Sequence, residues 1–205
     1  MESLQLAELQ LDALKEVANI ASGHAATALG QLTSRRIMIA VPEFTVARAD
    51  DIPEILGYSH ERVVVVAMHI LGDLTGALAF LIPVSKAARL SNLLLQRDLD
   101  AADALDEMAR SALAETANIL GGAYAGALGA LMACIVMVSV PAYGVEPPDR
   151  VLTRLQKSES GDHIGLCIET ELTCEGELID FGGHMLLFPS PASLGVILDA
   201  LQVRP

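Results

Sequence analysis

The sequence contains two copies of one segment, separated by 99 positions. Asp12–Phe44 aligns without a gap with Ser111–Tyr143, and 15 of these 33 positions are identical. Self-similarity of this length indicates an internal duplication. Any fold for this chain must therefore accept the same unit twice. We expect one domain over residues 1–205, built from two repeats at about residues 9–97 and 107–204.

Both copies predict the same order of elements: a long helix, a short strand that ends at a proline, a loop, two further strands and a second helix. The acidic link Asp98–Glu107 is too short to tether independent domains. The fold class we expect is α+β: a pseudo-two-fold duplicated domain with long helices packed on a largely antiparallel β-sheet. The later strands and the second helix are expected at Arg62–Ile70, Gly76–Ile82 and Ser85–Gln96 in the first copy, and at His163–Leu172, Glu177–Phe188 and Ser193–Val203 in the second.

The stretch Thr116–Val145 carries no charged residue and resembles a membrane helix in its spacing of small residues. The repeat argues against a membrane span, because the aligned part of the first copy contains His24, Arg35 and Arg36. We expect no membrane segment. The small residues instead predict tight packing, with Gly126 and Gly129 close to another backbone.

Composition excludes several classes of partner. The formal net charge is -13 and no segment clusters Lys or Arg with aromatic residues, so nucleic acid and anionic membrane surfaces are poor partners. The three cysteines lack the C-x-x-C spacing and are interpreted as buried thiols in a reducing compartment. The amino-terminal residues do not resemble a signal peptide. Together these features predict a cytoplasmic location.

A polar stripe runs along the first helix of each repeat. Asp12, Glu16, Asn19 and Gly23 step by four, three and four residues, which places them within about 60° on a helical wheel. The opposite side is apolar, so the stripe should face solvent while its back packs on the sheet. The same spacing recurs in the second copy at Ser111, Glu115, Asn118 and Gly122.

Each of these residues has an ordinary explanation. Surface helices commonly carry Asp, Glu and Asn, and Pro42 and Pro141, at the ends of the predicted short strands, can simply terminate them. The stripe nevertheless persists in both copies while many neighbouring positions differ. This pattern favours a functional role for the stripe over surface decoration.

The stripe suits hydrolysis of a group that another protein carries. A carboxamide both donates and accepts hydrogen bonds, so it can hold a water in line with a phosphorus atom. A glutamate can pair with a lysine of the partner and fix the docking register, and Gly23 and Gly122 leave room for close approach. Phosphoryl transfer depends mainly on positioning and charge neutralisation. We therefore expect no cofactor of the chain's own, with Mg²⁺ supplied at the partner's phosphorylation site.

The quoted motifs resemble the CheC/CheX/FliY family of chemotaxis phosphatases, and especially its CheC-like members, over essentially the whole chain. The residues that carry the resemblance are Glu16-Val-Ala-Asn19-Ile and Gly23-His-Ala-Ala-Thr-Ala-Leu29, then Glu115-Thr-Ala-Asn118-Ile-Leu-Gly and Tyr124.

The resemblance implies dephosphorylation of the phosphorylated response regulator CheY. It implies one site at Glu16 and Asn19 and a second at Glu115 and Asn118, with Asn orienting the water. The supporting positions of the motif are matched by Asp12, Ser111, Gly23, Gly122, Pro42 and Pro141. It also implies the receptor deamidase CheD as a possible partner.

The sequence departs from the family pattern beside both asparagines. Ala18 and Ala117 stand where a glycine often precedes the Asn, and we expect their methyl groups to slow docking of the partner. His24 replaces a common Asn. We interpret it as a surface histidine rather than a metal ligand, because no second His or Cys lies at helical ligand spacing.

Other classes of function have less support. The histidines form no H-x-H or H-E-x-x-H motif, and the chain has no Walker A loop and no G-x-S-x-G motif. Metal-dependent hydrolysis and the common nucleotide and serine hydrolase classes are therefore not indicated. The open alternative is a docking or adaptor protein that binds CheY or CheD through the same helix faces without turnover. A flagellar-switch component is expected to carry a further carboxyl-terminal domain.

Overall fold

A computed structural model describes residues 8–57, 62–98, 105–148, 150–151, 164–175 and 177–201. The long helix, the short strand before the proline, the later hairpin and the second helix are confirmed in both copies, but the expected loop contains a further short strand in each copy and a short helix in the first. The first repeat forms α1 (Glu8–Thr33), β1 (Ile37–Ala40), β2 (Phe44–Arg48), α2 (Ile52–Leu56), β3 (Val63–Gly72), β4 (Gly76–Pro83) and α3 (Val84–Leu94). The second forms α4 (Glu107–Met132), β5 (Val136–Val138), β6 (Ala142–Glu146), β7 (Ile164–Cys174), β8 (Glu177–Pro189) and α6 (Pro191–Ala200).

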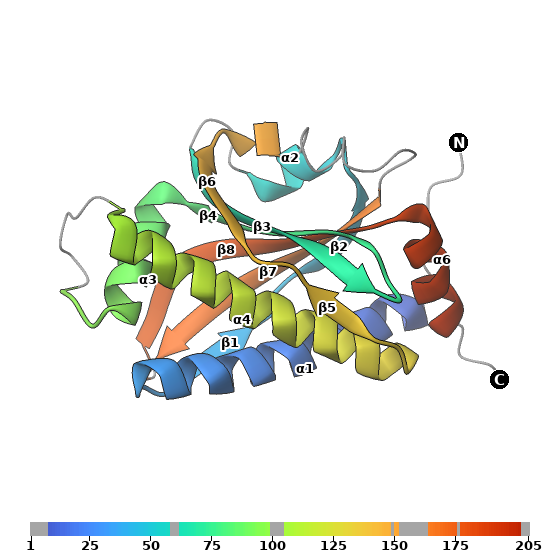
Figure 1. Cartoon of the computed structure of the whole chain (residues 1–205), viewed down its shortest axis with the longest axis horizontal. Coiled ribbons are helices and arrows are strands. Elements are labelled where there is room, and N and C mark those ends of the chain that lie inside the picture. Colours follow the sequence, from blue (N-terminus) through green and yellow to red (C-terminus); the bar gives the residue numbers. More distant parts are fainter. Residues whose placement is uncertain are drawn as a thin grey trace.

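The strands of the described residues form one antiparallel sheet in which the two repeats exchange their edges (Figure 1). The hairpins β3–β4 and β7–β8 meet at the centre, where β4 pairs with β8. The short strands β1 and β2 of the first repeat pair with β7, whereas β5 and β6 of the second repeat pair with β3. Each repeat therefore supplies the outer strands of the other repeat's hairpin.

The exchange follows the internal symmetry residue by residue. Phe44 lies opposite Ile168, and its counterpart Tyr143 lies opposite Val66. Together with the helix-covered antiparallel sheet, these matched registers confirm the expected α+β fold with pseudo-two-fold duplication.

The sheet has a helix-rich face and a face covered by the short helix α2. Figure 1 shows α1 and α4 lying side by side in front of the sheet, running in opposite directions. Side chains from α1, α3, α4 and α6 share one buried core with alternate strand residues such as Phe80 and Met185. A second, smaller core on the opposite face joins Ile52 and Leu56 of α2 to Leu81 and Phe188. The alternation of strand side chains separates the two cores.

Helices α1 and α4 end in the same way. Ser34 and Ala133 adopt left-handed backbone angles (φ 54° and 51°), and the chain turns back over the last helical turn. A Cβ atom on Gly129 would lie 2.7 Å from the carbonyl oxygen of Cys134, so a glycine is required there. The expectation that Gly126 also lies near another backbone is wrong, because Gly126 is exposed and its Cβ position is open.

Among the described helices, none combines the length and apolar character needed to cross a bilayer. The uncharged part of α4, residues 116–132, places many of its small and apolar side chains in the core shared with α1 and the sheet. A Cβ atom on Gly121 would lie 2.8 Å from Cε of Met68, which shows how closely α4 approaches β3.

Candidate functional site

The first stripe lies on the solvent-facing side of α1, as expected. Asp12, Glu16, Asn19 and Gly23 are all exposed. The buried side of the same helix is formed by Leu14, Val17, Ala21, Ala25 and Leu29. The Cβ position of Gly23 is surrounded by open space, so a partner can approach the helix backbone at this point.

The second stripe has the same placement on α4. Ser111, Glu115 and Gly122 are exposed, and Asn118 is half-buried. Gly122 is open to solvent in the same way as Gly23. Because a glutamate and an asparagine three residues apart lie on one side of a helix, each stripe presents a carboxylate beside a carboxamide.

The structure corrects one expectation about these stripes. The side chains of Ala18 and Ala117 are 1% and 0% exposed and belong to the core between the helices and the sheet. Their methyl groups therefore point away from the docking face. Although Ala18 and Ala117 precede the asparagines in the sequence, they do not obstruct a partner that approaches the stripes.

A buried hydrogen bond joins the two helices that carry the stripes. The hydroxyl groups of Ser22 and Tyr124 lie 2.9 Å apart. Burial raises the pKa of Tyr124 to about 12, although the hydrogen bond to Ser22 acts in the opposite direction. Sequence analysis missed this contact, because the residues aligned with Ser22 and Tyr124 in the other copy are Gly121 and Ala25, which have no side-chain hydroxyl groups. The pair fixes the position of α1 against α4 and so the spacing of the two stripes.

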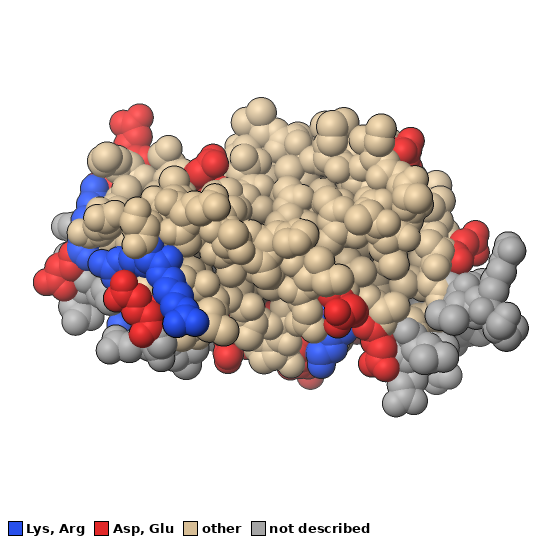
Figure 2. Space-filling view, turned by 90° about the horizontal axis from the view of Figure 1, so that it is seen from below, with Lys and Arg blue, Asp and Glu red and all other residues tan. Residues whose placement is uncertain are grey.

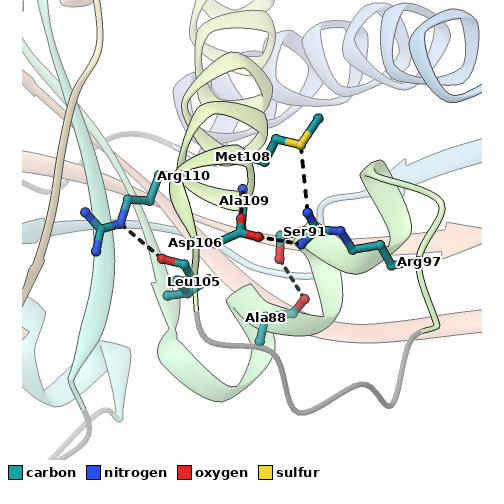
Figure 3. A network of polar contacts seen from close by, with 8 residues as sticks. All are labelled: Ala88, Ser91, Arg97, Leu105, Asp106, Met108, Ala109 and Arg110. Carbon is teal, nitrogen blue, oxygen red and sulfur yellow. Dashed lines mark hydrogen bonds and ion pairs between the residues drawn. The ribbon is translucent and has the colours of Figure 1, made fainter.

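The start of α4 is held by a local polar network (Figure 3). The Asp106 carboxylate accepts a hydrogen bond of 2.7 Å from the backbone N–H of Ala109, as an N-cap residue does. Arg97, which follows α3, donates to the other carboxylate oxygen at 3.0 Å. The hydrogen bond from Ala109 and the neighbouring Arg97 lower the pKa of Asp106. Ser111, the first residue of the second stripe, is thus placed one turn after a fixed helix start.

The two prolines lie apart from the stripes. Pro42 separates β1 from β2, and Pro141 separates β5 from β6, at the two edges of the sheet. A proline has no backbone N–H to donate to a neighbouring strand, which explains why each edge is divided into two short strands. Pro42 and Pro141 therefore shape the two edges of the sheet.

The surroundings of the two stripes differ in charge. Exposed Lys15, His24 and Thr27 flank the first stripe, whereas the aligned residues of α4 are Ala114, Ala123 and Gly126. The expectation that His24 is a surface residue is confirmed. Seen from the α1 side (Figure 2), the surface has a wide area without charged side chains, and acidic residues lie mainly toward its margins. The two stripes therefore offer related chemistry in different electrostatic settings.

The structure also shows the burial of the cysteines and the arrangement of possible metal ligands. Cys167 and Cys174 are buried and Cys134 is half-buried, and all three are free thiols. Within the described ranges, no group of three or more His, Cys, Asp or Glu side chains is arranged to hold a metal ion.

This chain is similar in sequence to known proteins. The CheC-like family model matches residues 9–46. The CheY-P phosphatase CheC of Bacillus subtilis (strain 168) is 31% identical over 198 residues, which cover 95% of this chain and 94% of that protein.

Two solved structures are similar in fold. FliY of Thermotoga maritima has a TM-score of 0.79 at 22% identity, covering 97% of this chain and 98% of that chain. A complex of CheX with CheY, BeF3 and Mg²⁺ from Borrelia burgdorferi gives a TM-score of 0.51 at 13% identity, covering 83% of this chain and 96% of that chain. The identity and near-complete coverage of the Bacillus subtilis relative show that this chain belongs to the CheC-like family.

Proposed function

We propose that this chain is a protein-aspartate phosphatase that dephosphorylates a phosphorylated CheY-type response regulator. The observation that carries the proposal is the Glu and Asn pair on the outer side of α1 and again of α4, in which Glu16, Asn19 and Glu115 are exposed and Asn118 is half-buried. The name of the Bacillus subtilis relative, a CheY-P phosphatase, supports the reaction. The complex of a CheX with CheY supports the kind of partner, since that protein has a similar fold.

In this mechanism the chain contributes position rather than a nucleophile. The amide of Asn19 or Asn118 enters the partner's phosphorylation site and holds a water in line with the phosphorus atom. The water oxygen forms the new P–O bond while the bond to the partner's aspartate oxygen breaks, so the products are inorganic phosphate and a free aspartate carboxylate. Mg²⁺ bound at the partner's phosphorylation site would supply charge neutralisation for the phosphoryl group.

The neighbouring glutamate has a docking role. Glu16 and Glu115 lie one turn before the asparagines and can pair with a lysine beside the partner's phosphorylated aspartate. Asp12 and Ser111 lie a further turn back and support the same contact. Because the stripes are on exposed helix surfaces rather than in a cleft, the reacting phosphoryl group must be supplied by a protein that covers the helix.

The test measures phosphate release from a CheY-type regulator charged with acetyl phosphate and Mg²⁺. We expect wild-type protein to accelerate release, Asn19→Ala and Asn118→Ala each to retain the activity of one site, and the double variant to lose about 100-fold or more. Gln31→Ala is the matched control, because Gln31 is an exposed carboxamide on α1 outside the stripe. Full activity in the double variant would exclude both asparagines as the water-orienting groups.

The docking alternative gives a different result in the same assay. An adaptor would bind the regulator in a pull-down and leave its phosphate lifetime unchanged, in wild type and variants alike. Binding of the deamidase CheD is a second prediction from the family resemblance. Co-purification with CheD, repeated with the double variant, separates a CheD surface from the phosphatase stripes.

A further inference from the structure

A small pocket lies on the face of the sheet opposite the two stripes, beside α2. It has a volume of about 190 Å³. The floor is formed by β7 and β8, one side by β2, and another by the end of α2. Its lining residues are Glu43, Thr45, Ile55, Leu56, Cys167, Glu169 and His184. The proposed phosphatase mechanism uses none of them.

The pocket combines an apolar wall with two carboxylates. Leu56 is buried and Ile55 half-buried, and both come from α2. Thr45 donates a hydrogen bond of 3.2 Å to the Glu43 carboxylate, which helps to hold it at the pocket. The backbone N–H of Glu169 in β7 donates to the carbonyl oxygen of Glu43 at 3.0 Å. This hydrogen bond, between β7 and the residue just before β2, brings the two glutamates together.

The remaining polar groups are uncharged at neutral pH. Burial lowers the pKa of His184 to about 4 and raises the pKa of Cys167 to about 12. The Cys167 side chain is 3% exposed, and its thiol is a free one with no hydrogen bond among the described contacts. Lys86 is close enough to influence His184. Lys86 does not line the pocket, so the charged side chains among the lining residues are the carboxylates of Glu43 and Glu169.

The duplication provides an internal comparison for this site. In the first repeat's hairpin, Val65 lies opposite Gly144 and Ala67 lies opposite Ala142. The matching pairs at the pocket are Cys167 with Thr45 and Glu169 with Glu43. The residues paired at this place therefore lack polar side chains in the first repeat's hairpin, where the nearest carboxylate is that of Glu146 beside Gly144, and supply a thiol, a hydroxyl and two carboxylates at the pocket. Sheet architecture alone does not require these polar groups, because the other half forms the same structure without them.

We propose that this pocket binds a primary alkylammonium group, either that of a small amine or that of a lysine side chain on a partner protein. The carboxylates of Glu43 and Glu169 receive the ammonium head, and Ile55 and Leu56 pack on the alkyl stem. A volume of about 190 Å³ is too small for a nucleotide and suits such a group. A metal ion is not the ligand favoured, since the described His, Cys and Glu side chains do not converge as ligands.

The test titrates the full-length protein with n-butylammonium chloride at constant ionic strength. NMR shifts of the His184 ring and of the β7 amides report on the pocket directly. We expect saturable binding with a dissociation constant of about 1 to 10 mM, in the range for a ligand of this size. The uncharged probe 1-butanol, which has the same number of heavy atoms, should give no saturable shift at these groups.

Matched variants identify the carboxylates. Glu43→Gln and Glu169→Gln keep the side-chain shape and should each weaken binding about fivefold or more. Glu171→Gln removes the same charge from an exposed position on β7 outside the pocket and should change binding less than about twofold. Thermal unfolding of each variant verifies that the fold is intact.

The outcomes separate the two sources of the ammonium group. Binding of a blocked Gly-Lys-Gly peptide about tenfold tighter than n-butylammonium assigns the pocket to a protein side chain, and equal affinity assigns it to a free amine. The proposal is overturned if the wild-type protein shows no saturable shift, if 1-butanol gives the same shifts, or if the two Gln variants titrate like wild type. Phosphatase activity does not enter any of these measurements.

Discussion

The hydrogen bond between Ser22 and Tyr124 leads to a quantitative prediction about the packing of α1 on α4. The two hydroxyl groups are buried and 2.9 Å apart. In Tyr124→Phe the remaining Ser22 hydroxyl can turn to the carbonyl oxygen four residues earlier in its own helix, so the cost should be about 1 kcal/mol. In Ser22→Ala the Tyr124 hydroxyl is fixed at the end of a rigid ring and loses its partner in a buried place. We expect that change to cost about 2 kcal/mol.

The double variant tests whether these costs arise from one interaction. It should be less destabilised than the sum of the single variants, with a coupling free energy of about 1 kcal/mol. Urea unfolding at neutral pH, followed by circular dichroism, measures all four free energies of unfolding. Tyr143→Phe is the control for removing a tyrosine hydroxyl. The Tyr143 hydroxyl is buried and lacks a hydrogen-bond partner among the described residues, so its removal should be neutral or slightly stabilising.

Two results would refute this interpretation. Strict additivity of Ser22→Ala and Tyr124→Phe would show that the hydroxyl groups do not interact in solution. An equal loss in Tyr143→Phe and Tyr124→Phe would show that the destabilisation comes from changing the ring rather than from the bond between the helices.

Two further predictions concern glycine packing and acid stability. Gly129→Ala should destabilise the protein by about 1 to 3 kcal/mol, because its Cβ atom would lie 2.7 Å from the Cys134 carbonyl oxygen. Gly126→Ala, at an open helical position, should stabilise it by about 0.5 to 1 kcal/mol, and equal effects in urea unfolding would contradict the packing. His184 has its pKa lowered from 6.5 to about 4 by burial, so the unfolded chain takes up its proton first as the pH falls. The contribution of neutral His184 to the free energy of unfolding is present above about pH 6.5 and is lost toward pH 4. His184→Gln should therefore flatten the dependence of the free energy of unfolding on pH between these values. An unchanged slope in the variant would contradict the lowered pKa.

The repeat made much of this fold predictable. Helical periodicity placed the exposed and buried sides of α1 largely correctly, since Leu14, Val17, Ala21 and Ala25 on the back of the first stripe belong to the core and Ala28 is half-buried. The strands before the prolines and the strands of the two hairpins were also predicted within a few residues, but β2 and β6 were missed because a loop was expected after each proline. The short helix α2 was missed, since five residues are too few to show a helical period.

Long-range pairing could not be predicted. Whether β1 lies beside its own hairpin or beside that of the other repeat is decided by contacts more than 100 residues apart, such as Ile37 with Cys174. The same limit applies to the Ser22–Tyr124 bond and to the pocket at Glu43 and His184. In the polar stripes, sequence neighbours were also neighbours in space, which is why these residues could be selected in advance.

The exchange of edge strands has a consequence for folding. A repeat that folded by itself would leave the outer side of its hairpin uncovered and its own two short strands without a partner. Neither half has a complete sheet until both have been synthesised, and the contacts that close the sheet span long stretches of chain, which slows folding. Linking the copies in one chain raises the effective concentration of each half for the other to the millimolar range. The duplicated chain thus resembles a strand-exchanged dimer whose subunits cannot diffuse apart.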